Sequence, residues 1–514
     1  MANFFKKAKL AGAVAAAMAA GLAVQTAEAV NLSPDGLGEV ALVPYYSARN
    51  GYDTYISIVN TDPVNVIAVK IRFREHDNSR DARDFLIYLS PNDVWTGTIT
   101  MHAAVDATGA PLPPDAAGNP ALGWPVIQTN DNSCTVPSLI PFEADASQAT
   151  RAGMRGVAFT SADYDGTTRT DVGSSSIVRT YDGYVEIIEM GTANPAVSPI
   201  AALAVHSNGV PASCPTLEAQ YNEAVITSGF QHIQAQFREP LNVMKVAANL
   251  INAGSGLVVP MPVTMLANFN NNNSLMLNPP RDTRPDLGDV FPPEIIKINS
   301  AGGVQTDEFE TGYDSVSALL MATSVINEYA IGGAARALND WVLTFPTKHF
   351  YADGRALSPF SNSYGACETV EYDYANREEN SPVGFNVPFS PPLPTPVPQI
   401  CKEVNILSFA VDGNNIYSAL AGNISNASPP PANNVYGIQL EDGFTSGWLN
   451  LTFTGNAATD AENGGIVGTD TNDGITETRY LGLPVIGFGI KTYSNTTTGI
   501  QYGITQEHAY TRNP

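Results

Sequence analysis

Basic residues are scarce in this 514-residue chain, which carries 26 Lys and Arg against 50 Asp and Glu and has a formal net charge of −24. Proteins bind nucleic acid mainly through Lys and Arg, so this composition excludes a nucleic-acid partner. Only 15% of the residues are charged, whereas 44% are hydrophobic. This balance leaves ample apolar surface to bury and is not typical of a disordered protein.

Long hydrophobic runs are also missing, apart from residues 10–24. This run follows a basic segment and precedes a small-x-small cleavage site (Lys6, Lys7 and Lys9; Ala27-Glu28-Ala29). The pattern is typical of a signal peptide, so we expect residues 1–29 to be removed. The run is too short to cross a bilayer, and we expect no transmembrane segment in the mature chain. We therefore expect a protein exported by a Gram-negative bacterium to the cell surface, the extracellular medium or the periplasm.

Cysteine is rare, with four residues and no CxxC pair. In an oxidising compartment, an even number of cysteines at wide spacing is typical of disulfides rather than of a metal site. Three pairings are possible, and the sequential one closes the shortest loops. We therefore predict two sequential disulfides, which pair Cys134 with Cys214 and Cys367 with Cys401.

Common catalytic and nucleotide-binding motifs are absent from the sequence. It contains no GxSxG, HExxH, GxxxxGK[ST] or GxGxxG pattern. The six His are widely scattered, and neither His206 nor His508 has a ligand pattern beside it. His349 follows Lys348 in a strand-like run, which predicts an exposed strand end. We therefore assign no catalytic residue and expect that the protein is not an enzyme.

The dominant hydrophobic period after Gly38 is two residues. Short β-branched and aromatic runs occur at residues 54–61, 66–73, 84–91 and 94–100, and again at 340–353, 403–413, 447–455 and 482–493. They favour a mainly β fold with two or more antiparallel, immunoglobulin-like β-sandwich domains and few short helices. We expect an N-terminal sandwich at 30–130, a middle β-rich region at 131–300 and a C-terminal β-rich domain at 301–514. The middle region contains a short helix (214–226) and a long, polar, exposed loop (268–289) that is either flexible or used for interaction.

One segment holds an unusual number of charges for this chain. Residues 70–84 contain nine charged positions, and His76 lies among them. In the strand, the apolar side chains point one way and the basic ones the other (Val69, Ile71 and Phe73; Lys70, Arg72 and Arg74). We interpret the basic row as a solvent-facing strand surface, followed by a charged connection whose residues pair in water. A catalytic role for His76 with Asp77 or Asp81 is the alternative, although no nucleophile motif accompanies it.

Two loops carry oxygen ligands suited to calcium. Each places Asp or Asn side chains around a glycine turn (Asp163, Asp165 and Asp171; Asp470, Asn472 and Asp473). Neither loop fits the EF-hand pattern. In the second, Leu481 stands where the bidentate Glu belongs. Asp, Asn and Gly are also ordinary turn residues. Calcium at these residues is therefore one interpretation and plain turn chemistry is the other, with no further cofactor expected.

Four tyrosines gather near the mature N-terminus (Tyr45, Tyr46, Tyr52 and Tyr55). Exposed aromatic side chains can stack on sugars or contact partner proteins, whereas buried ones pack within sheets. We expect packing, with ligand binding as the alternative. No binding residue is otherwise assigned.

Several blocks of the sequence resemble a family of exported, largely uncharacterised proteobacterial proteins that are sometimes labelled cell-surface proteins. The blocks are GLGEVALVPYYSARNGYDTYISIVNT, SRDARDFLIYLSPNDVWTGTI, GYVEIIEMG, DWVLTFPTKHFYAD and GLPVIGFGI. They occur in the same order as in that family and cover most of the mature chain. The resemblance implies an exported, cell-surface location and no particular catalytic or binding residue.

Two classes of function fit these observations best. The first is a non-enzymatic structural or surface-layer-like protein of the cell envelope, which associates with itself or with other envelope components. The second is a secreted module that binds carbohydrate or another surface ligand, for which exposed aromatic side chains would be the distinguishing feature. A secreted hydrolase is a third class, and it would require convergent carboxylates or a His dyad in one deep pocket.

Overall fold

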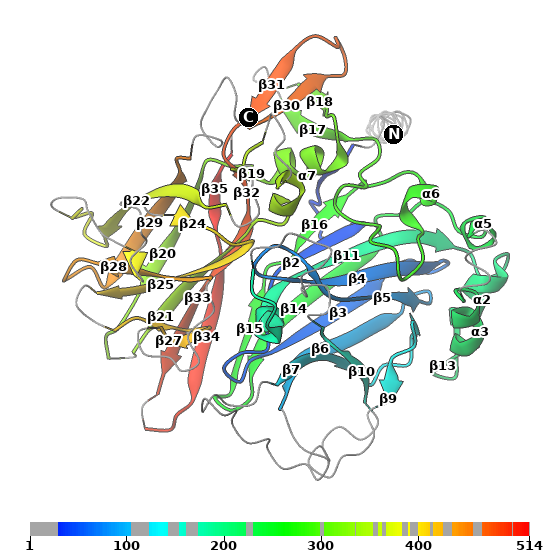
Figure 1. Cartoon of the computed structure of the whole chain (residues 1–514), viewed down its shortest axis with the longest axis horizontal. Helices are drawn as coiled ribbons and strands as arrows, with labels where there is room; N and C mark the ends of the chain where they lie inside the picture. The colour runs from blue at the N-terminus through cyan, green and yellow to red at the C-terminus, as the bar shows by residue number, and fades with distance from the viewer. Residues whose placement is uncertain are drawn as a thin grey trace, which may run out of the picture.

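The computed structural model describes residues 29–103, 123–141, 154–160, 173–222, 230–298, 303–334, 336–352, 358–361, 366–382, 389–390, 399–411, 415–424, 434–455, 465–495 and 497–512. Strands make up 51% of the described residues and helices 10%, which confirms a mainly β fold with several antiparallel sheets and few helices. Strands from the first and second halves of the chain lie in two groups, side by side (Figure 1).

Two seven-stranded sheets form the first group. Sheet I has the order β1 (Asn31–Leu32), β16 (Thr264–Ala267), β2 (Val40–Ser47), β11 (Asp182–Ala193), β4 (Val66–Glu75), β5 (Asp81–Leu89) and β8 (Cys134–Val136). Sheet II has the order β15 (Leu257–Met261), β14 (Met244–Asn252), β3 (Asp53–Asn60), β6 (Val94–His102), β7 (Trp124–Thr129), β10 (Arg155–Ala158) and β9 (Ile140–Pro141). Strands on both sides of residue 130 therefore share both sheets.

Two further sheets form the second group. Sheet III has the order β24 (Gln399–Ile400), β22 (Glu368–Asn376), β29 (Ser446–Phe453), β20 (Ser324–Ala330) and β35 (Ala509–Thr511). Sheet IV has the order β23 (Phe389–Ser390), β28 (Val435–Leu440), β25 (Val404–Val411), β21 (Leu338–Thr344), β33 (Ile486–Ser494) and β34 (Gln501–Glu507). All described pairs in these sheets are antiparallel except β25 with β28.

Smaller elements connect the larger sheets. A four-stranded sheet joins β17 (Glu294–Ile298) and β18 (Val304–Glu308) to β30 (Ile466–Asp470) and β31 (Glu477–Tyr480), and so links the two groups. The two-stranded sheets are β12 (His206–Ser207) with β13 (Val210–Pro211), β19 (Met321–Ala322) with β32 (Leu483–Pro484), and β26 (Tyr417–Ser418) with β27 (Gly422–Asn423).

The described helices are short. They are α2 (Pro199–Ala204), α3 (Cys214–Ala219), α5 (Gln231–Gln234), α6 (Asn273–Met276) and α7 (Gly312–Leu320), with 3₁₀ turns η3 (Ile177–Thr180) and η4 (Lys348–Tyr351). Ser198, Ser213 and Thr311 cap α2, α3 and α7 by accepting a backbone N–H in the first turn. None of these helices combines the length and the apolar character needed to cross a membrane.

Sheet I is covered on both faces, which explains its unusual burial. In β3 of sheet II, buried and partly exposed residues alternate, as expected for a strand with one solvated face. In β2, β4 and β11 every residue is buried. Ile71 and Phe73 belong to one hydrophobic cluster with Ile56 and Trp95 of sheet II. On the opposite face, Leu86 belongs to a second cluster together with residues of α2, α3, α5 and α6.

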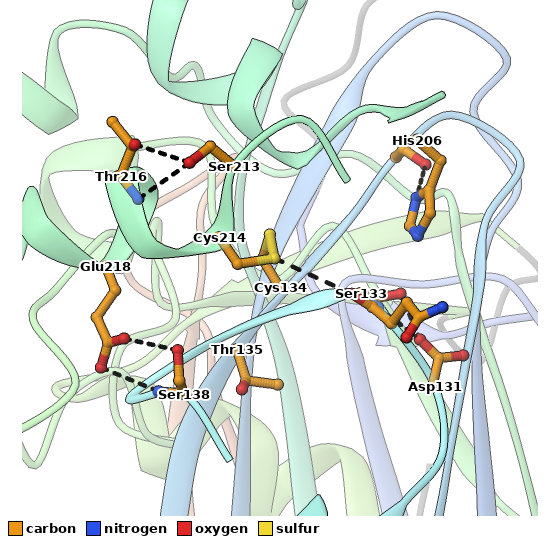
Figure 2. Close-up of a disulfide and its surroundings, with 12 residues drawn as sticks. Asp131, Ser133, Cys134, Thr135, Ser138, His206, Ser213, Cys214, Thr216 and Glu218 are labelled. Atoms are coloured by element: carbon orange, nitrogen blue, oxygen red, sulfur yellow. Dashed lines mark hydrogen bonds between the residues drawn. A yellow bond between two sulfur atoms is a disulfide. The ribbon is translucent and has the colours of Figure 1, made fainter. Parts of the chain in front are cut away.

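Both predicted disulfides form, and the sequential pairing is confirmed. Cys134 in β8 bonds Cys214 at the start of α3, and Cys367 bonds Cys401. The first bond fastens α3 to the edge of sheet I, where Glu218 also accepts hydrogen bonds from the backbone and hydroxyl of Ser138 at 3.0 and 2.6 Å (Figure 2). The two disulfides indicate an oxidising, exported environment.

Candidate functional site

Residues 70–80 of the charged segment are buried and residues 81, 83 and 84 are partly buried, so the interpretation of its basic row as solvent-facing is wrong. Lys70 and Glu75 are 0% exposed. The turn that follows, which was expected to pair its charges in water, is buried as well, because His76 is 3% and Asp77 2% exposed. The alternation of side chains identifies two faces of β4 correctly, but both of those faces are covered.

A long loop covers the basic face of β4. Lys70 donates from Nζ to the backbone carbonyls of residues 282 and 284. Arg72 donates from Nη1 to the carbonyls of Thr283 at 2.5 Å and Pro285 at 3.0 Å. The loop at 268–289, which the sequence predicts to be exposed, is therefore exposed only in part: Thr283 is exposed, but the backbone carbonyls of residues 282–285 pack onto buried cations. The loop carbonyls and the cationic side chains of β4 form hydrogen bonds with each other, so that burial leaves neither unpaired.

The basic row of β4 is also paired with carboxylates. Arg72 contacts Asp81 through two nitrogens, at 3.2 and 2.6 Å. Arg74 donates to Glu186 of β11 from two nitrogens, each at 3.1 Å. Burial by itself raises the pKa of Asp81, but Arg74 and Arg72 outweigh it and lower the pKa to about 2. Asp81 therefore stays ionised, and its negative charge is balanced by the two arginines.

Glu75, the last residue of β4, organises the turn that follows. Its carboxylate accepts backbone N–H bonds from residues 77, 78 and 80 at 2.6, 2.9 and 3.0 Å. Arg179 of η3 adds a two-nitrogen contact at 2.7 and 2.8 Å. Five donors thus converge on one buried carboxylate. Such a group is a structural anchor, because it has no free lone pair to offer a substrate.

His76 and Asp77 connect this turn to the second half of the chain. His76 Nδ1 lies 3.3 Å from Asp182. Asp77 lies 2.6 Å from Nζ of Lys402. The carbonyl of His76 accepts the backbone N–H groups of residues 403 and 404 at 3.0 and 3.1 Å. Although burial lowers the pKa of His76, Asp182, Asp77 and Glu75 raise it above its usual value. This histidine therefore acts as a further cation among carboxylates.

We call these residues the ion-pair network: Arg72, Arg74, Glu75, His76, Asp77, Asp81, Arg179, Asp182, Glu186 and Lys402. Other contacts join the two halves around it. Asn434 donates to Asp182 at 2.9 Å, and Thr344 Oγ1 donates to the carbonyl of residue 44 at 2.6 Å. The network consequently holds sheet I against the strands of sheet IV and the segments that lead into them.

Lys348 and His349 do not lie at an exposed strand end, and that prediction is wrong. Both are in η4, where Lys348 is 6% exposed and donates from Nζ to the carbonyls of residues 366 and 401 at 2.8 and 2.9 Å. Burial lowers the pKa of Lys348, and the neighbouring Glu403 and Glu368 oppose that shift. Burial, followed by Arg74 and Arg72, holds the pKa of His349 well below its usual value.

His206 has neighbours that the sequence did not reveal. Its Nδ1 lies 2.9 Å from Ser90 Oγ and 3.3 Å from a carboxylate oxygen of Asp93. Both partners face the same ring nitrogen, so the three residues do not form a proton relay of the serine-hydrolase type. His508 is buried, contacts Asn327 at 2.9 Å, and has a pKa that burial lowers to about 4.

One of the two candidate calcium loops can be assessed. Asp470 Oδ1 accepts the N–H of Asn472 at 2.8 Å, and Asp473 Oδ1 accepts those of Ile475 and Thr476, both at 2.8 Å. These contacts are those of ordinary Asx turns. Within the described ranges, no three His, Cys, Asp or Glu side chains gather as metal ligands. Asp163, Asp165 and Asp171 lie outside the described residues, and calcium at either loop stays a prediction.

The tyrosine group near the N-terminus is largely buried. Tyr45 and Tyr46 are 0% and Tyr52 3% exposed, whereas Tyr55 is partly exposed. Tyr52 donates its hydroxyl to the carbonyl of residue 419 at 2.9 Å and so contributes to the contact between the halves. These residues pack within and between the sheets, as expected from the packing interpretation.

The sequence signal for the network was incomplete. It singled out the residues of β4 and the turn, but missed Arg179, Asp182, Glu186 and Lys402. Charged residues in an otherwise apolar strand, as in β11, are a usable signal, because such residues are rarely buried unless they are paired. Lys402 has no local signal, because its partner Asp77 lies more than 300 positions earlier in the sequence.

Several buried groups, among them Glu403, Asp340 and His76, bind protons more tightly in the folded chain than in the unfolded chain. Burial raises the pKa of Glu403 to about 8, against an opposing effect of Lys348, and raises that of Asp340 to about 6. The pKa of His76 is also raised, as described above. The stability linked to a raised pKa is present at low pH and is lost as the pH rises through the folded value. For Asp81, with its lowered pKa, stability is lost only as the pH falls below about 3.8.

We therefore expect the melting temperature to be highest near pH 5 and to fall by several degrees toward pH 8.5. Lys348 contributes with the opposite sign, because burial lowers its pKa. Glu403→Gln should flatten the fall, because the variant has no buried carboxyl to ionise. The exposed Glu378→Gln should keep the wild-type profile. Calorimetry across this range is the measurement, and a melting temperature that rises steadily from pH 5 to 8.5 would contradict the expectation.

No family model, curated protein or solved structure matches this chain.

Proposed function

We propose that this chain is a non-enzymatic exported protein with a structural, surface-layer-like role in a bacterial cell envelope. The observation that carries the proposal is the burial of its densest charge cluster, whose members pair with one another and join the two halves of the chain. A substrate-facing cluster would instead leave at least some of these groups accessible. The disulfides and the resemblance to exported proteobacterial cell-surface proteins support the same conclusion.

The proposed partners are further copies of this chain or other envelope components. Without residues 1–29, 23 basic and 49 acidic residues remain, a net charge of −26. Screening at physiological ionic strength acts over about 8 Å, so copies in close contact repel one another unless cations lie between them. Carboxylates near the surface, such as those of the exposed Asp473 and the partly exposed Asp470, are suitable weak ligands for shared calcium. Divalent cations are therefore proposed to promote association at the surface.

Chelation provides the test of this proposal. Treatment of intact cells with EDTA is expected to release the protein into the medium, and added calcium is expected to restore it to the cell surface. Sodium chloride at equal ionic strength is the control, because it screens charge without bridging carboxylates. A purified protein that stays monomeric at high concentration with calcium, together with its recovery as a free periplasmic protein, would contradict the proposal.

A secreted module that binds carbohydrate or another surface ligand is the second candidate. The observation that favours it is the exposure of Trp448, at 43%, in the middle strand of sheet III. We also infer that sheets I and II, and sheets III and IV, pack as β-sandwiches. The cluster that contains residues of both sheets I and II supports this inference, while the immunoglobulin-like topology stays a prediction.

A further inference from the structure

Trp448 is exposed at the centre of a sheet. It lies in β29, the middle strand of sheet III, and is 43% exposed. Of the other three tryptophans, Trp95 and Trp341 are fully buried, and Trp124 stacks on His102 with ring centroids 6.5 Å apart. Burying an indole is strongly favourable, so an exposed one in a central strand marks a surface that contacts something else.

The residues beside Trp448 on neighbouring strands leave its ring accessible. Ala375 lies opposite it in β22 and Glu328 opposite it in β20. The methyl group of Ala375 is too small to cover an indole. Glu328 has a side chain that is 55% exposed and pairs with Lys491. The ring is therefore flanked by one small residue and by one charge that already has a partner.

Polar side chains extend along the same face. Because side chains alternate along a strand, Asn450 and Thr452 share the face of Trp448. Their neighbours in β22 are Asp373 and Glu371, both exposed. The amide nitrogen of Asn450 makes only a long contact with Thr452, at 3.4 Å. From Trp448 to Thr452 the row spans about 14 Å at the usual rise per residue in a strand. We call Trp448, Asn450, Thr452, Glu371 and Asp373 the Trp448 face.

The chemistry of this face matches a sugar. One side of a pyranose ring presents C–H groups that pack on an aromatic ring, and its edge presents hydroxyls that donate to carboxylates and accept from amide N–H groups. Sites for small ligands combine an apolar platform with a few polar groups in this way. Glu371 and Asp373 carry negative charge, which repels anionic polymers. A neutral ligand rich in hydroxyl groups fits both the platform and the charge.

We propose that the Trp448 face binds a neutral polysaccharide, with Trp448 as the stacking platform and the carboxylates of Asp373 and Glu371 and the amide nitrogen of Asn450 as hydrogen-bond partners for sugar hydroxyls. The row of polar residues is long enough to contact more than one sugar ring. The proposal rests on the second candidate function and specifies its site and ligand class, because such a site would hold the protein on a glycan of the envelope or its surroundings. It does not depend on self-association or on calcium.

Affinity electrophoresis of the purified full-length protein tests this proposal. The gels contain neutral polysaccharides in turn, namely a β-glucan, a starch-type α-glucan, a mannan and a galactan, and polygalacturonate serves as the anionic comparison. Retardation is expected in at least one neutral gel and not in polygalacturonate. Trp448→Ala should weaken binding at least about tenfold, equivalent to roughly 1.4 kcal/mol. Asp373→Asn should weaken it severalfold.

Trp124→Ala is the matched control, because it removes the other exposed tryptophan and leaves the Trp448 face intact. It should bind as the wild type does, and a blue shift of tryptophan emission on adding the polysaccharide should persist in it and vanish in Trp448→Ala. Equal melting temperatures would show that both variants fold. The proposal is overturned if none of the four neutral polysaccharides binds, or if Trp448→Ala binds unchanged. It is also overturned if sedimentation shows that Trp448 instead mediates contact between copies.

Discussion

Replacing Arg179 by Ala is expected to lower the free energy of unfolding by about 3–5 kcal/mol, the usual effect of removing one partner of a buried ion pair. The Glu75 carboxylate is 0% exposed and loses both guanidinium contacts in the variant. Its three backbone donors remain, but they cannot balance a full charge in a region that water does not reach. Denaturant unfolding followed by circular dichroism measures the loss.

Two variants serve as controls for this measurement. Arg377 is exposed, so Arg377→Ala should change the free energy of unfolding by no more than about 0.5 kcal/mol. Arg179→Lys keeps the charge but not the two-nitrogen contact, and an intermediate loss is expected. If Arg179→Ala loses no more stability than Arg377→Ala, the pair contributes nothing and the account of the turn fails.

Removing the disulfide between Cys134 and Cys214 should have the second large effect. The bonded cysteines are 80 positions apart, and the loss of this constraint on the unfolded chain corresponds to roughly 4.5 kcal/mol. For Cys367 and Cys401, which are 34 positions apart, the same relation gives roughly 3.8 kcal/mol. The double Ser variants should therefore both be strongly destabilised, and the first pair slightly more so.

Unfolding with and without reductant distinguishes the disulfides from other effects of substitution. Reductant should lower the stability of the wild type and should have no effect on the variant in which all four cysteines are Ser. A wild type whose stability does not change when both bonds are reduced would contradict the expectation. Free thiols in the oxidised protein would contradict it as well.

The strands and disulfides were predictable because their signals are local or countable. A period of two residues with β-branched side chains gave β3, β4, β6 and β29 at nearly their observed positions. Four cysteines in an exported chain leave few pairings, and the shortest loops are those observed. Alternation also separated Ile71 and Phe73 correctly from Lys70, Arg72 and Arg74. These features depend on residues that are close in the sequence or on the number of cysteines, and both can be read from one sequence.

The position of the charged face was not predictable, because alternation does not say what lies against each face. The carbonyls of Thr283 and Pro285, which accept from Arg72, lie more than 200 positions further along the chain. Lys348 was misplaced for a similar reason, since the carbonyls that hold it become adjacent only after folding. The unusual density of charge in a charge-poor chain was the right signal. Its meaning depended on distant partners that leave no local pattern.

The central claim is that the charged segment forms a structural ion-pair network rather than a reactive site. The double-mutant cycle of Glu75 and Arg179 tests it most directly, using Glu75→Gln, Arg179→Met and the double variant. Each single variant leaves the other partner with an unmet charge or donor, so the double variant should be more stable than the sum of the two losses predicts. We predict a coupling energy of about 1–3 kcal/mol. Additive losses, with a coupling energy of zero within error, would contradict the claim.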